Sequence, residues 1–143
     1  MRTMRYVSAP SGETLVIVEN GMVRCIALDA RPEWTVGRGT HDNYPDIDLK
    51  AMIVSRRHGM FVRMDGQWHF SCNPKNTNPT YINGDLIYRR PDEPRRPVPL
   101  KNGDVLRIDS RDLNRPDERG VLMLFTTTRM TGRWSMYSLD SPA

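Results

Sequence analysis

Short apolar runs rich in β-branched residues recur along this chain, and polar turn residues separate them. Asn-Gly or Asp-Gly pairs begin at Asn20, Asp65 and Asn83, between neighbouring runs, and such pairs supply the positive φ values of tight hairpin turns. The run from Asp46 to Leu49 alternates acidic and apolar residues, which is the period of a half-buried strand. We find no helical periodicity longer than one turn. The pattern predicts an all-β antiparallel sandwich of around ten short strands.

The apolar runs also predict where the strands lie. The first hairpin has strands from Leu15 to Val18 and from Met22 to Leu28, and we expect its first strand to extend a sheet edge. Trp68 and Phe70 share one face of a later strand, which predicts core positions. Further strands are expected at residues 34–36, 46–49, 60–64, 67–70, 80–82, 85–88, 105–108 and 121–128.

The length of 143 residues suits one domain with a substantial core. We expect the sandwich over residues 1–130, including an N-terminal hairpin extension at about residues 14–21. Residues 131–143 are expected to form a tail that either packs back onto the sandwich or serves as a linker. The segment from Arg89 to Pro97 carries three prolines and four arginines, so it predicts a stiff polyproline-like loop and not a central strand.

The formal net charge is +4, from 21 basic and 17 acidic residues. This mild excess suits an acidic partner, which includes phosphopeptides and nucleic acids. Cys25 and Cys72 are too few and too far apart for a disulfide framework or a zinc site, so a cytoplasmic setting is expected. The apolar runs are too short to span a membrane, and the N-terminal residues do not resemble a signal peptide.

Three polar islands stand at the ends of apolar runs: Gly37-Arg38, then Ser55 to His58, then Asn76 to Gly84. Their positions predict loops or strand edges. Together they offer cations, hydroxyls and carboxamides, and these are groups that hold a phosphate. Glycine before Arg38 permits a close backbone approach that other residues resist. The islands therefore indicate an anion-binding site and not a site that breaks bonds.

The islands occur in the order Gly-Arg, Ser-x-x-His and Thr-Asn-x-Thr-x-x-Asn-Gly, and Leu100-x-x-Gly103-Asp104-x-Leu106 follows them. In this order they resemble the forkhead-associated (FHA) domain family, a phosphothreonine-peptide-binding module. The resemblance implies a two-sheet antiparallel β-sandwich of about 10–12 strands, SMAD/FHA-like, with its binding loops at one end. It also implies no catalytic activity and no cofactor. The implied partner is a phosphothreonine-containing protein or peptide, phosphorylated by a Ser/Thr kinase. The resemblance thus implies that the protein is a signalling or adaptor module.

The resemblance also implies which side chains contact the phosphopeptide. Charge-assisted hydrogen bonds to phosphate are about twice as strong as neutral ones, so the phosphate is expected to control binding. A carboxamide carries both a donor and an acceptor, and therefore suits the peptide backbone. The implied phosphate ligands are Arg38 and Ser55, helped by Arg56 and Thr77, and the implied carboxamide is Asn78. Arg57 is either a further phosphate contact or a solvated surface charge.

Support of the site is implied for Gly37, His58, Asn83 and Gly84. His58 is expected to be buried and to brace the binding loops, since a neutral imidazole can bridge two groups. Two positions depart from the family pattern, because Pro79 stands where the family usually has Gly and Asn76 where it usually has Ser. Proline fixes φ near about −65° and removes an amide, so the loop shape and the peptide preference depend on this position.

Metal binding is not expected. Asp46 and Asp48 lack a third ligand at a useful spacing. His69 and Cys72 stand three positions apart on a strand, so their side chains are expected on opposite faces. The alternative of a hydrolase built on Ser55 and His58 lacks a Gly-x-Ser-x-Gly elbow and an orienting acid.

Two other functions remain open. A nucleic-acid-binding domain would use Arg89, Arg90, Arg95 and Arg96, but it lacks interleaved aromatic residues and a recognition helix. A phospho-independent protein-interaction module of the same fold would use the same loops without phosphate, and the departures at Asn76 and Pro79 keep it open.

Overall fold

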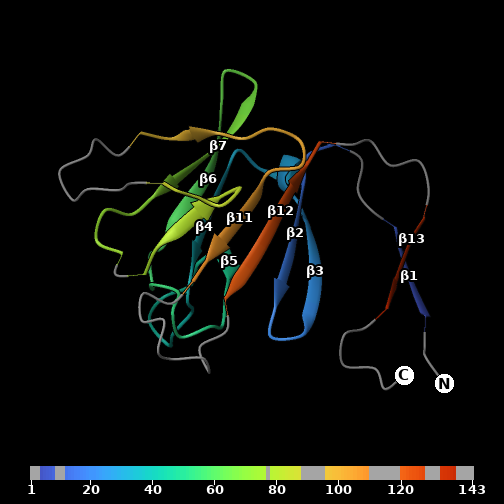
Figure 1. The fold of residues 1–143 in the computed structure, drawn as a ribbon, viewed down its shortest axis with the longest axis horizontal. Helices are drawn as coiled ribbons and strands as arrows, with labels where there is room; N and C mark the ends of the chain where they lie inside the picture. Colours follow the sequence, from blue (N-terminus) through green and yellow to red (C-terminus); the bar gives the residue numbers. More distant parts are fainter. Residues whose placement is uncertain are drawn as a thin grey trace.

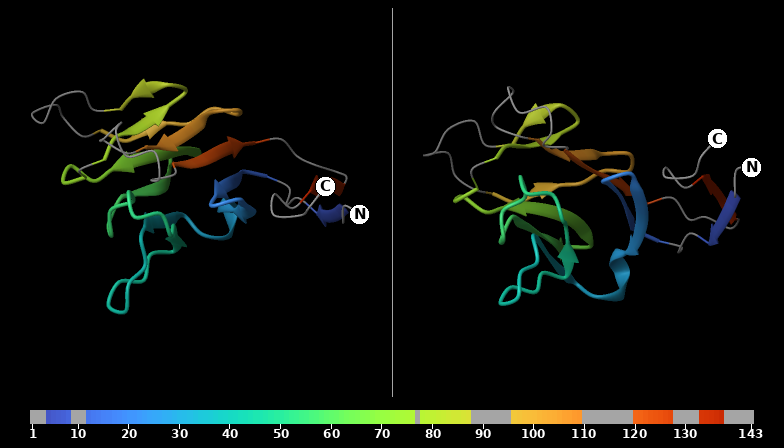
Figure 2. Two further views of the ribbon diagram at one scale, coloured as in Figure 1. Left: turned by 60° about the horizontal axis from the view of Figure 1, so that its bottom comes forward. Right: turned by 90° about the horizontal axis from the view of Figure 1, so that it is seen from below.

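The computed structural model describes residues 12–76, 78–87, 96–109 and 120–127, together with the backbone of two terminal strands, β1 (Met4–Ser8) and β13 (Arg133–Tyr137). Two sheets stack face to face (Figures 1 and 2). This confirms the predicted all-β, two-sheet sandwich.

The six-stranded sheet has the order β3-β2-β12-β11-β8-β9. Its strands are β2 (Thr14–Glu19), β3 (Met22–Ala27), β8 (Thr80–Ile82), β9 (Asp85–Leu86), β11 (Val105–Ile108) and β12 (Val121–Thr126). The five-stranded sheet has the order β10-β7-β6-β4-β5. Its strands are β4 (Glu33–Gly37), β5 (Ile47–Asp48), β6 (Gly59–Met64), β7 (Gln67–Cys72) and β10 (Val98–Pro99). A 3-10 turn, η1 (Leu28–Ala30), follows β3. Strands β4 and β5 pair in parallel, whereas the sequence pattern predicted antiparallel pairing.

The predicted hairpin turns form at Asn20, Asp65 and Asn83, with φ angles of 50°, 53° and 52°. A glycine with positive φ follows each of them. Two consecutive positive φ values match the right-handed twist of the flanking strands, which is why these turns connect β2 to β3, β6 to β7 and β8 to β9. The local turn chemistry therefore sets these connections.

The position of β2 differs from the prediction. We expected the segment from Leu15 to Val18 to extend a sheet edge, but β2 lies between β3 and β12, and β3 forms the edge. The register between β2 and β12 runs from Thr14 opposite Thr126 to Val18 opposite Leu122. This partner is distant in sequence, so the local pattern could not reveal it.

The core fills the space between the sheets. Trp68 and Phe70 are both buried on β7, as predicted from their shared face. The Phe61 and Phe70 rings pack with centroids 5.0 Å apart and planes inclined by 57°, a favourable tilted arrangement. From the other sheet, alternate residues of β2 and β12 complete this core, among them Leu15, Ile17, Val121, Met123 and Phe125.

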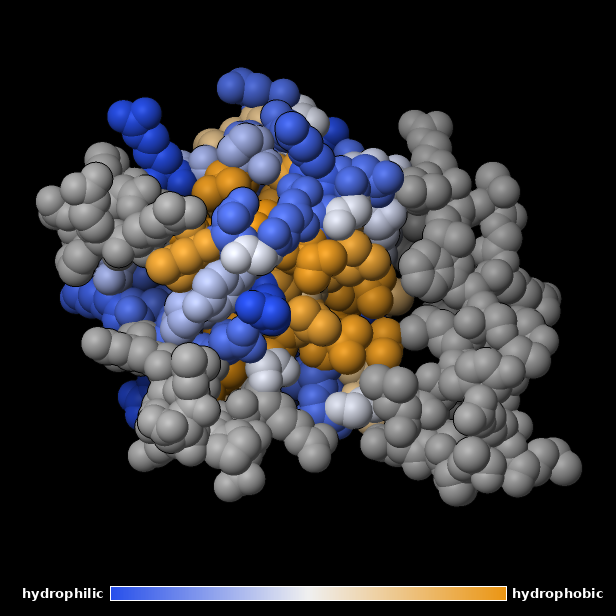
Figure 3. Space-filling view, in the orientation of Figure 1, coloured by the Kyte–Doolittle hydropathy of each residue, from blue (hydrophilic) through white to orange (hydrophobic). Residues whose placement is uncertain are grey.

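The outer face of the six-stranded sheet is also apolar. Leu122 is 41% exposed and lies opposite Val18, and the half-buried Leu124 lies opposite Val16. Apolar side chains gather over this part of the molecule in Figure 3. Strand β12 is therefore apolar on both of its faces.

Strands β1 and β13 form a separate two-stranded antiparallel sheet, in which Met4 lies opposite Tyr137 (Figure 1). The apolar pattern predicted neither strand. Of the proline-rich arm, residues 89–95 lie outside the described residues, and Arg96 and Pro97 are exposed. No helix within the described ranges is long and apolar enough to span a membrane.

Candidate functional site

Three loops meet at one end of the five-stranded sheet. Val36 of β4 lies opposite Gly59 of β6, which in turn lies opposite Cys72 of β7. Because these strands alternate in direction, the end of β4, the start of β6 and the end of β7 lie side by side. The loops at residues 38–46, 49–58 and 73–79 therefore share one rim, and each carries a polar island or its neighbours.

Side chains from two of these loops hold the segment before Ser55. The Asn78 Nδ2 donates to the Ile53 carbonyl at 2.9 Å, and the Arg38 Nε donates to the Val54 carbonyl at 3.2 Å. The Arg38 backbone N–H donates to the Ser55 carbonyl at 3.1 Å. Three successive carbonyls are thus bonded from outside the segment, which fixes the direction of the Ser55 side chain.

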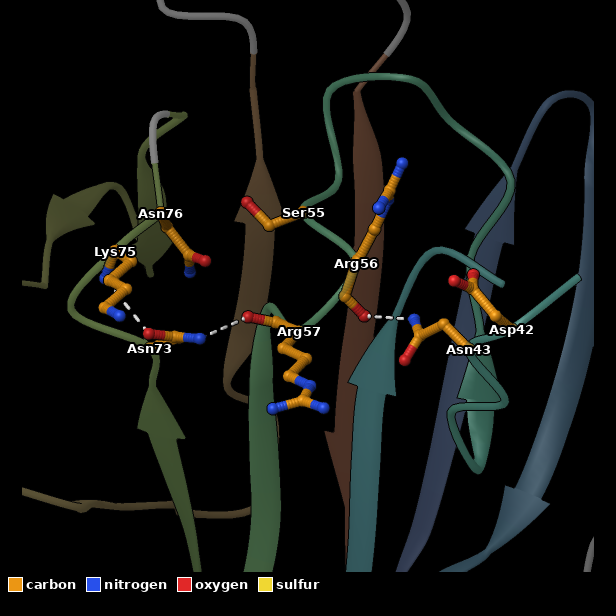
Figure 4. Close-up of a pocket in the computed structure, with 8 residues that line it drawn as sticks. All are labelled: Asp42, Asn43, Ser55, Arg56, Arg57, Asn73, Lys75 and Asn76. Atoms are coloured by element: carbon orange, nitrogen blue, oxygen red, sulfur yellow. Dashed lines mark hydrogen bonds between the residues drawn. The ribbon is translucent and has the colours of Figure 1, made fainter. Parts of the chain in front are cut away.

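Two asparagines hold the turn that follows Ser55 (Figure 4). The Asn43 Nδ2 donates to the Arg56 carbonyl at 2.8 Å, and the Asn73 Nδ2 donates to the Arg57 carbonyl at 2.8 Å. The Asn43 Nδ2 also donates to the Arg38 carbonyl at 3.0 Å. The turn is therefore anchored on both flanks.

Gly37 lets this turn approach strand β4. A Cβ atom built on Gly37 would fall well inside van der Waals contact with the backbone carbonyl of Arg56. No side chain fits between the two backbone segments. Gly37 thus allows Arg38 and the turn at Ser55 to lie against each other.

His58 is fully buried behind the turn. Its Nδ1 accepts a hydrogen bond from the Ser55 backbone N–H at 3.2 Å, so Nε2 carries the proton and donates to the Thr80 hydroxyl at 2.8 Å. The His58 carbonyl accepts from the Asn73 backbone N–H and from the Asn76 Nδ2. Desolvation by burial lowers the pKa of His58 to about 4, so the ring is neutral at pH 7. It links two of the rim loops to the start of β8.

A pocket of about 370 Å³ opens between the loops. Figure 4 shows the Ser55 hydroxyl and the side chains of Lys75 and Asn76 around this space. Three cationic residues, one hydroxyl and three carboxamides line the pocket, against one carboxylate. The lining residues are Asp42, Asn43, Ser55, Arg56, Arg57, Asn73, Lys75 and Asn76.

The structure places the five residues predicted to contact the phosphopeptide in three different ways. Ser55 and Arg56 line the pocket itself. Arg38 and Asn78 bond the loop that carries Ser55. Thr77 lies outside the described residues.

The other supporting residues lie farther away. Asn83 and Gly84 form the turn at the end of β8 that is remote from the 73–79 loop. There the Asn83 Oδ1 accepts from the Val105 backbone N–H at 2.9 Å, and its Nδ2 donates to the Asp104 carboxylate at 2.9 Å. The turn between β8 and β9 is therefore hydrogen-bonded to the start of β11, and neither Asn83 nor Gly84 lines the pocket.

Sequence reasoning missed several lining residues. Arg57 was left open between a phosphate contact and a surface charge, and Asn43, Asn73 and Lys75 were not singled out. The available signal was the density of carboxamides in the two loops that flank the Ser-x-x-His island. Their role depends on which carbonyl each one reaches, and only the tertiary structure shows that.

Asn76 and Pro79, the two departures from the family pattern, each hydrogen-bond the 73–79 loop to another part of the protein. The Asn76 Nδ2 donates to the His58 carbonyl at 2.7 Å, so this carboxamide ties the loop to the base of the turn. The Pro79 carbonyl accepts from the Asp109 backbone N–H at 3.3 Å. Asn76 thus connects the loop to the residue before β6, and Pro79 connects it to the residue after β11.

Asp46 and Asp48 accept hydrogen bonds from the backbone and hold loops in place. Asp46 accepts from the Thr35 backbone N–H at 2.9 Å and pairs with Arg31, and these contacts lower the pKa of its carboxyl group. Asp48 accepts from the Gly39 backbone N–H and pairs with Lys50. Within the described residues, no three His, Cys, Asp or Glu side chains form a group that could hold a metal ion.

The geometry argues against a Ser55–His58 hydrolase. The His58 Nδ1 is occupied by the Ser55 backbone N–H and not by its hydroxyl, and the Nε2 is occupied by Thr80. Neither ring nitrogen is placed to take a proton from the Ser55 hydroxyl. His58 is a structural group.

Solved structures with this fold include two yeast proteins. The yeast Pml1 splicing factor aligns with a TM-score of 0.62 and 20% identity, over 87% of this chain and 86% of that chain. The N-terminal FHA domain of Rad53p from S. cerevisiae, solved in complex with a phosphothreonine peptide, aligns with a TM-score of 0.57 and 16% identity, over 80% of this chain and 94% of that chain. At these identities the likeness concerns the fold.

A curated relative is the oxoglutarate dehydrogenase inhibitor of Corynebacterium diphtheriae, which is 33% identical over 103 residues. The match covers 71% of this chain and spans 64% of that relative's length. The family model of the FHA domain matches residues 34–109, which is more than half of the chain and contains the rim loops. By this match the chain belongs to the FHA domain family, and the FHA domain is a binding module without catalytic activity of its own.

Proposed function

We propose that this protein binds a phosphothreonine-containing segment of a partner protein at the pocket beside Ser55. The observation that carries the proposal is the lining of that pocket, which combines the Ser55 hydroxyl with three cationic residues, Arg56, Arg57 and Lys75, against one carboxylate, that of Asp42. A dianionic phosphate gains charge-assisted hydrogen bonds from such a group, and a neutral hydroxyl does not.

The fixed backbone supports the proposal. Because Asn43 and Asn73 hold the turn on both flanks, the pocket needs little reorganisation when a ligand binds. Arg38 uses its Nε to hold the loop, and in this proposal its two Nη groups serve the phosphate. In this proposal Asn78, which holds the same loop, also contacts the peptide backbone.

The relatives support the partner class. Rad53p binds a phosphothreonine peptide through this fold, and the Corynebacterium relative is an inhibitor of an enzyme. We therefore place this protein in a signalling or adaptor role in the cytoplasm, with a Ser/Thr kinase that phosphorylates the partner.

The test compares peptides that differ only in the phosphate. Binding of the full chain is measured by calorimetry for a peptide library with phosphothreonine, and then for the best sequence with threonine, phosphoserine or glutamate. We expect the phosphate to increase affinity by at least about tenfold, which corresponds to about 1.4 kcal/mol. Equal affinity for the threonine peptide would favour a phospho-independent module instead.

Variants locate the site. Ser55→Ala and Lys75→Ala are each expected to weaken phosphopeptide binding by about tenfold, because each removes one phosphate partner. Lys101→Ala removes an exposed lysine that does not line the pocket, and serves as the matched control. A random oligonucleotide at moderate salt tests the nucleic-acid alternative, and tighter binding to it than to the phosphopeptide would overturn the proposal.

A further inference from the structure

Two apolar rows cross four strands on the outer face of the six-stranded sheet. Figures 1 and 3 show β11, β12 and β2 toward the viewer, with apolar side chains gathered over them. The alternate residues of these strands, such as Ile17 and Met123, point into the core, so the rows point outward. By the register, the first row is Val23, Val18 and Leu122, and the second row is Cys25, Val16, Leu124 and Val105.

Most of the two rows is accessible to solvent. Leu122 is 41% exposed, Val16 is buried, and the other five residues are half-buried. A sheet face that meets water usually carries polar residues at these outward positions. Contiguous apolar surface of this kind marks a contact with another molecule. The rows therefore indicate an interaction surface.

The charge beside the rows is neutralised within the chain. Arg107 lies opposite both Leu122 and Tyr81, at the end of the first row. Its Nε pairs with the Asp109 carboxylate at 2.7 Å, and its guanidinium lies over the Tyr81 ring, 5.1 Å from the centroid. The rows themselves consist of uncharged residues, although the chain carries a net charge of +4. Two copies can therefore meet at this face without bringing like charges into contact.

The relief of the face is complementary to itself. Strand β12 contributes Leu122 and Leu124, and the neighbouring β2 contributes the smaller Val18 and Val16 opposite them. The leucines form a ridge, and the valines form a groove beside it. A two-fold axis that runs parallel to the strands, between β2 and β12, places the ridge of each copy on the groove of the other. Close packing favours this arrangement, and a second copy supplies the same patch that a two-fold contact requires.

We propose that this face binds a second copy of the chain, with Leu122 of one copy against Val18 of its partner and Leu124 against Val16. The two six-stranded sheets then stack face to face. The pocket beside Ser55 lies at the end of the other sheet, so it stays open in the dimer. The contact does not depend on the proposed phosphothreonine site.

The dimer has a consequence that does rest on the proposed function. It presents two phosphothreonine pockets, so a partner with two phosphorylated segments binds it more tightly than a partner with one.

The size of the face sets the expected strength of the contact. Four strands at a spacing of about 4.8 Å give the rows a width of about 14 Å, so each copy contributes a few hundred Å². A standard interface buries about 800 Å² per partner. We therefore expect a weak dimer, with a Kd on the order of 100 µM.

The experiment measures the mass of the full chain by analytical ultracentrifugation from about 5 µM to about 1 mM. We expect the monomer at the low end of this range and the dimer at the high end. Leu122→Arg and Val18→Glu each place a charge on the face, so each variant alone should stay monomeric. An equimolar mixture of the two variants should dimerise again, because the introduced charges are opposite and meet across the contact.

Met64→Arg is the matched control, because Met64 is also a partly exposed apolar residue but lies on the other sheet. It adds the same charge as Leu122→Arg and should dimerise as the unmodified protein does. Thermal unfolding of each variant at low concentration shows that the fold is intact.

Cys25 provides a second measurement. It is a half-buried free thiol in the second row, whereas the other cysteine, Cys72, is buried. Its reaction with a maleimide should slow as the protein concentration rises, because the second copy covers it. Leu122→Arg should abolish this slowing.

The outcomes decide the proposal. A protein that remains monomeric up to about 1 mM overturns it, and so does a dimer that Leu122→Arg leaves intact. If the mixture of Leu122→Arg and Val18→Glu stays monomeric, the packing of ridge on groove is wrong. Affinity for a peptide with one phosphothreonine should be the same in all these variants, and a failure of the unmodified protein to bind that peptide would count against the phosphothreonine site alone.

Discussion

Arg38 and Asn78, which lie far apart in the sequence, donate hydrogen bonds to adjacent carbonyl groups, those of Val54 and Ile53. A guanidinium from the loop after β4 and a carboxamide from the loop after β7 thereby hold the same short segment. Ser55 follows that segment directly and lines the pocket. The orientation of the pocket hydroxyl therefore depends on two residues that do not line the pocket.

Replacement of Asn78 tests this dependence. Asn78→Ala removes the donor to the Ile53 carbonyl, and we expect the free energy of unfolding to fall by about 1 kcal/mol, with weaker phosphopeptide binding. Asn78→Asp keeps the shape but places an acceptor against an acceptor, so its loss should be at least as large. Denaturant unfolding and calorimetric titration provide the two measurements. Full phosphopeptide affinity in both variants would contradict a role for Asn78 in the site.

Arg38→Lys separates the charge of Arg38 from its geometry. Lysine keeps the positive charge but lacks the Nε that donates to the Val54 carbonyl. We expect phosphopeptide affinity to fall by about tenfold although the net charge is unchanged. Arg63→Lys, toward the other end of β6, is the control and should bind normally. Equal binding by Arg38→Lys and the unmodified protein would show that only the charge matters.

His58 gives the fold a defined response to acid. Its pKa is about 4 in the folded protein and 6.5 ordinarily, so the unfolded chain takes up the proton first as the pH falls. Stability is therefore full above pH 6.5, declines between pH 6.5 and about 4, and loses about 3 kcal/mol over that window.

The measurement is the free energy of unfolding in denaturant as a function of pH. His58→Gln should be less stable at pH 7 but should lose most of the slope between pH 6.5 and 4, because the titrating group is gone. The lowered carboxyl pKa of Asp46 acts below its ordinary value of 3.8, and so lies outside this window. An unchanged slope in His58→Gln would assign the acid response to another group.

Gly37→Ala tests the close approach of the turn to β4. The added Cβ would collide with the backbone carbonyl of Arg56, and backbone cannot move aside as a flexible side chain does. We expect a loss of more than about 2 kcal/mol in the free energy of unfolding, or a displaced turn and lost phosphopeptide binding. Gly66→Ala is the comparison, because a Cβ there meets open space and only the φ of +75° is strained, at a cost of about 1 kcal/mol. A smaller loss at Gly37 than at Gly66 would contradict the steric argument.

The short-range features of this fold could be predicted from the sequence. The turns at Asn20, Asp65 and Asn83 depend on the φ preference of two adjacent residues, and the burial of Trp68 and Phe70 depends on strand alternation. The order of the polar islands also indicated that their loops share one rim. Each of these inferences uses interactions within a few residues, or a pattern repeated along one strand.

The tertiary structure alone decided which distant segments meet. It placed β12 beside β2, which moved the sheet edge to β3, and it brought Asn43, Asn73 and Lys75 around Ser55. It also showed that Arg38 holds the loop beside the pocket. Strand pairing over long separations depends on packing and register across the whole sandwich, and the direction of a loop side chain depends on the carbonyl it reaches. Neither quantity is encoded in the residues next to it in the chain.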